Sequence, residues 1–189
     1  MNHLLPPERP IIKTVTRAEW LGSDDTIAGI KHKPVRIAIH HSESPTVAGY
    51  SGNGTIKAIH KWHTQNNGWI AEGYHYLISP DGSTIFEGRP ADIAGAHCGG
   101  NPPKGYDRQF GNTGSIGICL IGNYDLEKPA PDAMRTLAVL LFDLCERWQI
   151  DPANIYGHCE AWRPAGTRCP GEHLYRALFG DMRWAGLKF

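Results

Sequence analysis

Hydrophobic residues recur along this chain with two different spacings, which predict both strands and helices. Residues 35–41 form a run rich in apolar and β-branched side chains that ends at Ser-Glu-Ser-Pro, a pattern typical of a buried strand opening onto a loop. In residues 54–66, Ile56, Ile59 and Trp62 lie at helical spacing, and an Asn-Gly pair follows as a stop signal. We therefore expect a buried strand followed by an amphipathic helix.

Similar patterns continue through the rest of the chain. Residues 74–79 and 84–87 predict two strands joined by a Pro-Asp-Gly turn. Residues 131–148 place leucines and alanines at helical spacing behind a proline in the first turn. Residues 102–114 are polar and glycine-rich, which predicts a loop. Shorter elements are expected as follows: a helical turn at 14–20, strands at 116–122 and 155–157, and a last helix at 172–179.

Strands interleaved with helices predict an α/β fold with a central mixed β-sheet flanked by α-helices. The chain has 189 residues, of which 41% are hydrophobic, and this is enough for one well-formed core. We therefore expect a single domain over residues 1–189, with an extended, proline-rich lead-in at 1–13 and a core at about 14–180.

The charge balance and the apolar runs exclude some classes of partner. Lys plus Arg equals Asp plus Glu at 19 each, so the chain lacks the positive charge by which proteins gather nucleic acid. No stretch reaches the ~18 apolar residues of a membrane span, which predicts no membrane insertion. The first residues lack the basic and apolar regions of a signal peptide, so we expect synthesis in a cytoplasm. We also expect a monomer.

The ten histidines are more than a chain of this size usually carries, and histidine is the commonest zinc ligand. His40 stands at the end of one predicted strand, His158 directly follows another, and Cys169 comes in the loop after it. A catalytic zinc ion needs three nitrogen or sulfur ligands and one open position for water. These residues meet that description, but a histidine near a buried cysteine is also common in ordinary packing. Spacing alone leaves both interpretations open.

Short motifs, taken in order, give a second line of inference. They are R-A-E-W at 17–20, V-R-I-A-I-H-H-S at 35–42, I-H-K-W-H at 59–63, G-W-I-A-E-G-Y-H-Y-L-I at 68–78, E-G-R at 87–89, G-A-H at 95–97, S-I-G-I-C-L-I-G at 115–122, G-H at 157–158 and C-P-G at 169–171. Together they resemble the zinc-dependent N-acetylmuramoyl-L-alanine amidases of the amidase-2 and peptidoglycan recognition protein family, and within it the small amidase lysozymes of tailed phages. The resemblance covers nearly the whole chain.

The resemblance implies one catalytic zinc ion with His40, His158 and Cys169 as its ligands. Alternation along a strand lets only one of His40 and His41 face the ion, and the first of the pair matches the family's ligand. We expect His41 to be a hydrogen-bonded neighbour in the substrate-binding site. Cys159, next to His158, is the alternative to Cys169 as third ligand.

Further residues take catalytic or binding roles by the same resemblance. Tyr74 matches a tyrosine that lies beside the zinc ion and interacts with the attacking water or the developing oxyanion, with a core tyrosine as the alternative. Thr167 matches a catalytic-site position where threonine acts by hydrogen bonding, and His97 resembles a histidine that contacts substrate in the cleft. Cys119 stands where some relatives carry a glutamate as general base, so the base is either the zinc-bound hydroxide itself or a group that the sequence does not assign.

The function that the resemblance implies is hydrolysis of the amide bond between N-acetylmuramic acid and L-alanine in bacterial peptidoglycan. The phage-type motifs predict an endolysin, made in the host cytoplasm and released through a holin to act on the cell wall, with a prophage or bacterial origin as the alternative. The alternatives are a non-catalytic peptidoglycan-binding module, which in this family has lost a zinc ligand, and a muropeptide-recycling amidase, which uses an aspartate as third ligand. Cys169 distinguishes this chain from both. Pro90-Ala91 after E-G-R leaves the stem-peptide type, diaminopimelate or lysine, open.

Overall fold

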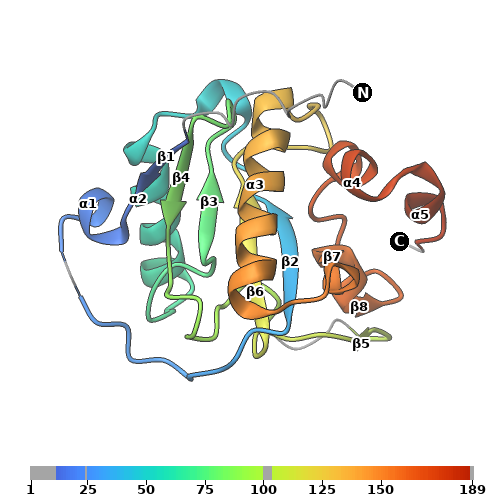
Figure 1. The fold of residues 1–189 in the computed structure, drawn as a ribbon, viewed down its shortest axis with the longest axis horizontal. Coiled ribbons are helices and arrows are strands. Elements are labelled where there is room, and N and C mark those ends of the chain that lie inside the picture. Colours follow the sequence, from blue (N-terminus) through green and yellow to red (C-terminus); the bar gives the residue numbers. More distant parts are fainter. Residues whose placement is uncertain (1–11, 24, 100–103, 188–189) are drawn as a thin grey trace, which may run out of the picture.

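Six strands form one mixed sheet at the centre of the protein (Figure 1). The computed structural model describes residues 12–23, 25–99 and 104–187. The strand order is β1-β4-β3-β6-β2-β7, and the strands are β1 (Lys13–Val15), β2 (Arg36–His41), β3 (Tyr76–Ile78), β4 (Thr84–Glu87), β6 (Ser115–Leu120) and β7 (Ile155–Gly157). Among the described strands of this sheet, the β3–β4 pair is antiparallel, as expected for a hairpin, and the other pairs are parallel.

The two longest strands, β2 and β6, lie side by side at the centre of the sheet. β2 pairs with β6 over six positions, from Arg36 opposite Ser115 to His41 opposite Leu120, and β7 pairs with the other edge of β2. Because β2, β3, β6 and β7 run in one direction, their carboxyl ends lie at the same edge of the sheet. The histidines that end β2 and follow β7 therefore come together at this edge.

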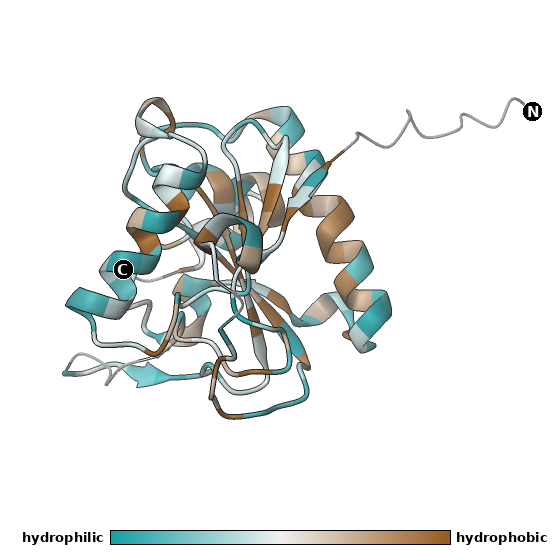
Figure 2. Ribbon diagram, turned by 90° about the vertical axis from the view of Figure 1, so that its left-hand side faces the viewer, coloured by the Kyte–Doolittle hydropathy of each residue, from teal (hydrophilic) through white to brown (hydrophobic). Residues whose placement is uncertain are grey.

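One face of the sheet is covered by the helix α3 (Pro131–Trp148). Its buried side chains, which recur every three or four residues, include Ala133, Leu137, Leu140 and Leu144, and they pack against the isoleucines of β2 and β6. Figure 2 shows hydrophobic residues concentrated in the central strands and along part of this helix. The helix begins with proline at its first position and ends at Trp148, and the cap residue Gln149 that follows has a φ of 56°.

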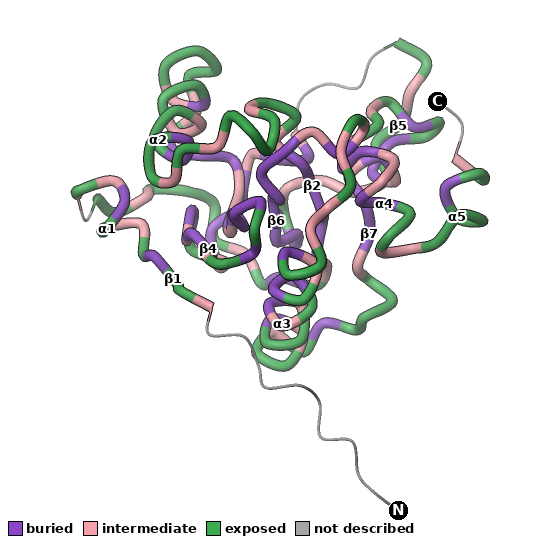
Figure 3. The backbone as a smooth tube through the Cα atoms, turned by 90° about the horizontal axis from the view of Figure 1, so that it is seen from above, coloured by how far each residue is buried: buried purple, intermediate pink, exposed green. Residues whose placement is uncertain are grey.

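The opposite face of the sheet is covered by the helix α2 (Asn53–Lys61), which continues as a π-helical turn, η2 (Trp62–Asn66) (Figure 3). The short helix α1 (Arg17–Leu21) begins in a capping box between Thr16 and Glu19. Its Trp20 is fully buried, and the indole N–H donates a hydrogen bond to the Glu87 carbonyl at 2.7 Å. These elements hold the β3–β4 side of the sheet.

The remaining elements lie in the segments that connect or follow the strands and helices described above. They are η1 (Val47–Gly49), β5 (Asp107–Arg108), η3 (Pro152–Asn154), η4 (His158–Ala161), β8 (Trp162–Arg163), α4 (Glu172–Phe179) and α5 (Asp181–Ala185). The strands β5 and β8 pair antiparallel, apart from the main sheet. They connect two loops that are distant in the sequence.

The structure confirms the predicted α/β fold and corrects some of its boundaries. Helix 131–148, helix 172–179 and the hairpin are found where the sequence placed them. The strand β1 begins at Lys13, the last residue of the lead-in expected at 1–13; residues 1–11 of that lead-in lie outside the described part. The loop predicted at 102–114 contains β5. Within the described residues, no helix combines the length and apolarity needed to cross a membrane.

Candidate metal centre

Two neighbouring histidines end β2, and their side chains point to opposite faces of the sheet. Ile37 and Ile39 pack in the core under α3, whereas Ala38 belongs to a cluster on the other face. By the alternation of a strand, His40 shares the face of Ala38 and His41 shares that of Ile39. The ring of His40 lies there among other aromatic and imidazole groups and is 1% exposed.

The structure brings His40, His158 and Cys169 together. One ligand atom from each of the three lies within 4.8 Å of the others, and Cys169 Sγ is 3.5 Å from His40 Nδ1. His158 opens η4 directly after β7, and its ring centroid is 4.5 Å from that of His40. Cys169 is held next to η4 because the Cys159 N–H donates to its carbonyl at 2.7 Å. Cys159 itself lies outside the group.

His41 is occupied elsewhere. Its Nδ1 accepts a hydrogen bond from the backbone N–H of Tyr124 at 3.2 Å, and the residue is 6% exposed. It also lines the cavity over the three-residue group. The structure therefore places His41 at the rim of the site with one ring nitrogen bound to the backbone.

His97 lies behind His40, on the side away from Cys169. Its Nδ1 is 3.0 Å from His40 Nε2, and its Nε2 is 3.4 Å from the carbonyl oxygen of Ser115. Cys98 Sγ is 3.9 Å from His40 Nε2, so His40, His97 and Cys98 form a second group of potential ligands that shares His40. The residue expected in the substrate cleft is thus in direct contact with a predicted metal ligand.

Tyr74 precedes β3 and faces the same group. Its ring centroid is 5.3 Å from that of His40 and 5.6 Å from that of His63. Burial, together with the nearby thiols of Cys119 and Cys169, holds the pKa of Tyr74 well above its usual value. The phenol therefore keeps its hydrogen at neutral pH and is available as a donor.

Thr167 supports Cys169 from within the same loop. Its hydroxyl oxygen accepts the Cys169 N–H at 3.2 Å, and the residue also lines the cavity.

Trp162, at the start of the neighbouring β8, directs its indole N–H to His158 Nε2 at 3.4 Å. The chain around β8 thus contacts a predicted metal ligand directly.

Burial governs the protonation of the group. Desolvation lowers the pKa of His158 to about 4, and it lowers the pKa of His40 well below its usual value, with the neighbouring His158 and His97 as smaller causes. Both imidazoles are therefore uncharged at neutral pH, and each has one ring nitrogen with a lone pair. Desolvation also raises the pKa of the Cys169 thiol well above its usual value. A cation at this point would counteract that effect by stabilising the thiolate.

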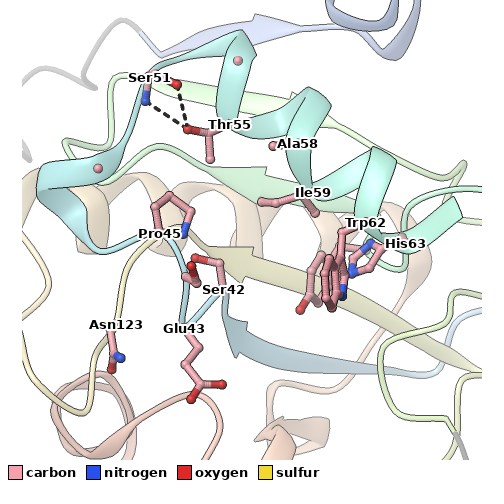
Figure 4. A pocket seen from close by; sticks show the side chains of 14 residues that line it. Ser42, Glu43, Pro45, Ser51, Thr55, Ala58, Ile59, Trp62, His63 and Asn123 are labelled. Atoms are coloured by element: carbon pink, nitrogen blue, oxygen red, sulfur yellow. Dashed lines mark hydrogen bonds between the residues drawn. The ribbon is translucent and has the colours of Figure 1, made fainter. Parts of the chain in front are cut away.

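The cavity over the three residues has a volume of about 420 Å³ and adjoins a larger one of about 890 Å³. Ser42, Glu43 and Tyr74 line both. Figure 4 shows the larger cavity between the loop that follows β2 and two consecutive helical elements, α2 with Thr55 and Ile59 and η2 with Trp62. We treat the two adjoining cavities together as one groove beside the candidate metal ligands.

Two further histidines of the motifs have structural contacts. His63 Nδ1 accepts the Gly73 N–H at 3.0 Å. His75 is fully buried; its Nδ1 accepts the Gly117 N–H at 2.8 Å, and its Nε2 donates to the Ile93 carbonyl at 2.9 Å. These contacts join the segment before β3 to its neighbours.

A family model described as N-acetylmuramoyl-L-alanine amidase, Amidase_2, matches residues 31–172, a range that contains His40, His158 and Cys169. The chain belongs to the Amidase_2 family. The Amidase_2 relatives include peptidoglycan-recognition protein SC1a/b of Drosophila simulans, which is 29% identical over 178 residues, or 93% of this chain and 89% of that protein. Peptidoglycan-recognition protein SD of Drosophila melanogaster is 28% identical over 188 residues, covering 92% and 88%.

Solved structures agree with this assignment. Wild-type PGRP-LB of Drosophila matches this chain with a TM-score of 0.70 and 28% sequence identity. The match covers 94% of this chain and 96% of the PGRP-LB chain. The crystal structure of Drosophila PGRP-SD matches with a TM-score of 0.72 at 24% identity, over 94% and 99%, which supports the fold.

Sequence reasoning did not identify the residues of the larger cavity. Glu43, Trp62 and Asn123 line it, and none carries a metal-ligand or nucleophile pattern. One signal was present: the Ser-Glu-Ser-Pro segment directly after β2 predicts a turn where ligands commonly bind. In the structure Glu43 has a φ of 60°, which is uncommon for a residue with a side chain.

Proposed function

We propose that this Amidase_2 chain is a zinc-dependent N-acetylmuramoyl-L-alanine amidase that hydrolyses the amide bond between N-acetylmuramic acid and L-alanine in peptidoglycan. The observation that carries the proposal is the group of His40, His158 and Cys169 beneath an open cavity. A structural zinc site has four protein ligands, whereas three ligands and an opening are characteristic of a catalytic one.

The donor set and its spacing fit zinc. In a tetrahedral zinc site, a nitrogen at ~2.1 Å and a sulfur at ~2.3 Å from the ion are about 3.6 Å apart. His40 Nδ1 and Cys169 Sγ are 3.5 Å apart. A bound zinc ion would supply a water nucleophile at neutral pH and polarise an amide carbonyl.

The protein's own groups would then stabilise the reaction. Tyr74, kept protonated by burial, would donate a hydrogen bond to the oxygen that becomes negative as the carbonyl is attacked. Thr167 would hold the Cys169 loop through the Cys169 N–H. Cys119 is buried and its thiol pKa is raised, so it does not replace the glutamate base of some relatives.

The groove would hold the substrate on either side of the reacting bond. The larger cavity offers the hydroxyls of Ser42 and Ser51, the Glu43 carboxylate and the exposed ring of Trp62, which suit a ligand with hydroxyls, amides and a sugar face. A tyrosine-to-phenylalanine variant of Drosophila PGRP-LB, 28% identical to this chain, is known in complex with tracheal cytotoxin. We propose that His41 and His97 border the part of the groove nearest the metal.

The cellular role that we propose is that of a phage endolysin, made in a host cytoplasm and acting on the cell wall after release. Its support is the resemblance of the phage-type motifs, including Cys119 in S-I-G-I-C. A non-catalytic peptidoglycan-binding module is the second candidate, because the relatives are named as recognition proteins. The complete set of ligands, with Cys169 in place, favours the enzyme.

Digestion of purified cell walls tests the proposal. The zinc-loaded protein should release new N-terminal alanine amines without new reducing ends, both measured chemically and by mass spectrometry. Cys169→Ser should lose most zinc and all release. Cys145→Ser is the matched control, because Cys145 is a partly exposed thiol on α3, outside the group.

Three results would contradict the proposal. New reducing ends that rise with lysis would indicate a glycosidase, and amines of another residue would indicate an endopeptidase. Wall binding without release of amines by zinc-loaded protein would leave the binding module as the function.

A further inference from the structure

The two ring nitrogens of His40 face different partners. Nδ1 points to Cys169 Sγ at 3.5 Å, and Nε2 points to His97 Nδ1 at 3.0 Å. A neutral imidazole has a hydrogen on one nitrogen and a lone pair on the other. A metal ion in the group of His40, His158 and Cys169 requires the lone pair of His40 to be on Nδ1. The contacts of Nε2 therefore decide which nitrogen of His40 carries the hydrogen.

His97 supplies the deciding contact. Its Nε2 is 3.4 Å from the carbonyl oxygen of Ser115, and a carbonyl oxygen only accepts, so the hydrogen of the neutral His97 ring lies on Nε2. His97 Nδ1 then has a lone pair and accepts a hydrogen bond from His40 Nε2. His40 thus donates a hydrogen bond to His97, and His97 donates one to the Ser115 carbonyl. This arrangement leaves the lone pair of His40 on Nδ1.

The His97 ring has little freedom to turn away from this arrangement. A Cβ atom placed on Gly117 or on Gly95 would come within 2.5 Å of its Cδ2, so the ring fills the space beside both glycines. The backbone N–H of His97 donates to Asn112 Oδ1 at 2.8 Å. The ring of His75 packs against it edge-on, with centroids 5.4 Å apart. The ring is thus held on several sides.

We propose that His97 is a positioning residue for the metal site: by accepting the hydrogen of His40 Nε2, it presents His40 Nδ1 to the metal ion. The inference rests on the zinc site of the proposed function and needs no hydrolysis. It also assigns His97 a role in metal affinity, separate from contact with substrate.

The second group of potential ligands, His40 with His97 and Cys98, fits a metal ion less well than the group with Cys169. A metal ion held there would take the place of the contact between His40 Nε2 and His97 Nδ1, which already lie at hydrogen-bond distance. Cys98 is fully buried and does not line the cavity that opens over Cys169. Of the two groups, the one with Cys169 offers room for a further ligand.

Two variants of similar shape test the role of His97. In His97→Asn the amide oxygen stands near the position of Nδ1 and still accepts a hydrogen bond, whereas His97→Leu has no acceptor. Zinc affinity is measured by competition with a chelator, without any peptidoglycan. The leucine variant should lose about 10- to 100-fold in affinity, and the asparagine variant should stay close to the parent. Circular dichroism and thermal unfolding without zinc show whether each variant is folded.

A measurement on the unaltered protein keeps the inference testable if a variant does not fold. Long-range ¹H–¹⁵N correlation spectra of histidine-labelled protein report which nitrogen carries the hydrogen. We expect the Nε2–H form for both His40 and His97. An Nδ1–H form of His40 would overturn the inference.

Three affinity results would also overturn it. One is an equal loss of affinity in both His97 variants, and another is a loss in neither. The third is a loss of zinc in Cys98→Ala together with full retention in Cys169→Ser, which would place the metal in the second group. Normal zinc binding without wall digestion would contradict the proposed function alone.

Discussion

Acidification should destabilise this protein through His75, a buried histidine outside both groups of potential metal ligands. Both of its ring nitrogens are used: Nδ1 accepts the Gly117 N–H and Nε2 donates to the Ile93 carbonyl. A proton added at Nδ1 would face an N–H group and lose that hydrogen bond. Desolvation, the largest cause, lowers the pKa of His75 to about 4 from the usual 6.5.

The sign and size of the effect follow from these two pKa values. Around pH 5 the unfolded chain carries a proton on His75 and the folded chain does not, so protons favour unfolding. The stability due to His75 is complete above pH 6.5 and is lost as the pH falls toward 4. Between about pH 7.5 and about pH 5, this one residue should lower the free energy of unfolding by about 2 kcal/mol.

Urea unfolding at several pH values, with the parent and His75→Gln compared, isolates this contribution. Both proteins are measured at the same zinc concentration, so proton uptake linked to the metal is common to both. The variant should be less stable at neutral pH, but its stability should fall less steeply below pH 6.5. Parallel pH profiles would refute the reasoning, because they would mean that the His75 ring titrates alike in the folded and unfolded chains.

Two further predictions concern the metal site. His41→Ala should keep its zinc, because the His41 ring is bound to the Tyr124 N–H, whereas His40→Ala should lose it. Elemental analysis measures both, and equal losses of zinc would contradict the assignment of His40 alone as the ligand of the pair. Tyr74→Phe should fold and bind zinc but digest walls on the order of 10²-fold more slowly, as for the removal of one oxyanion donor; an unchanged rate would leave Tyr74 with a packing role alone.

The parts of the fold that the sequence predicted are those with a local cause. Helix 131–148 has proline at its first position and leucines at helical spacing, so its limits were found without knowledge of its neighbours. The strand β1, by contrast, has three residues and owes its extended form to pairing with β4. The π-helical turn after α2 and the pairing of β5 with β8 likewise depend on contacts that no short window of sequence contains.

The features of the candidate site likewise fall into those that the local sequence predicted and those that depend on distant contacts. Alternation along β2 indicated that His40 and His41 face opposite sides, and the structure shows different partners for each. That His158 and Cys169 meet His40 depended on the resemblance, because spacing alone allowed ordinary packing. The contacts of His97 with His40 and with the Ser115 carbonyl could not be predicted from a motif, since they depend on how segments distant in the sequence come together.

The absence of a side chain at positions 95 and 117 also limits how this site can diverge. Gly95 and Gly117 border the His97 ring so closely that even an alanine at either position would displace it. In a library of random variants, both positions should therefore tolerate few substitutions, although neither carries a group that binds a metal or transfers a proton. Selection for metal binding would conserve two residues with no chemistry of their own, and the functional footprint in an alignment would be larger than the site itself.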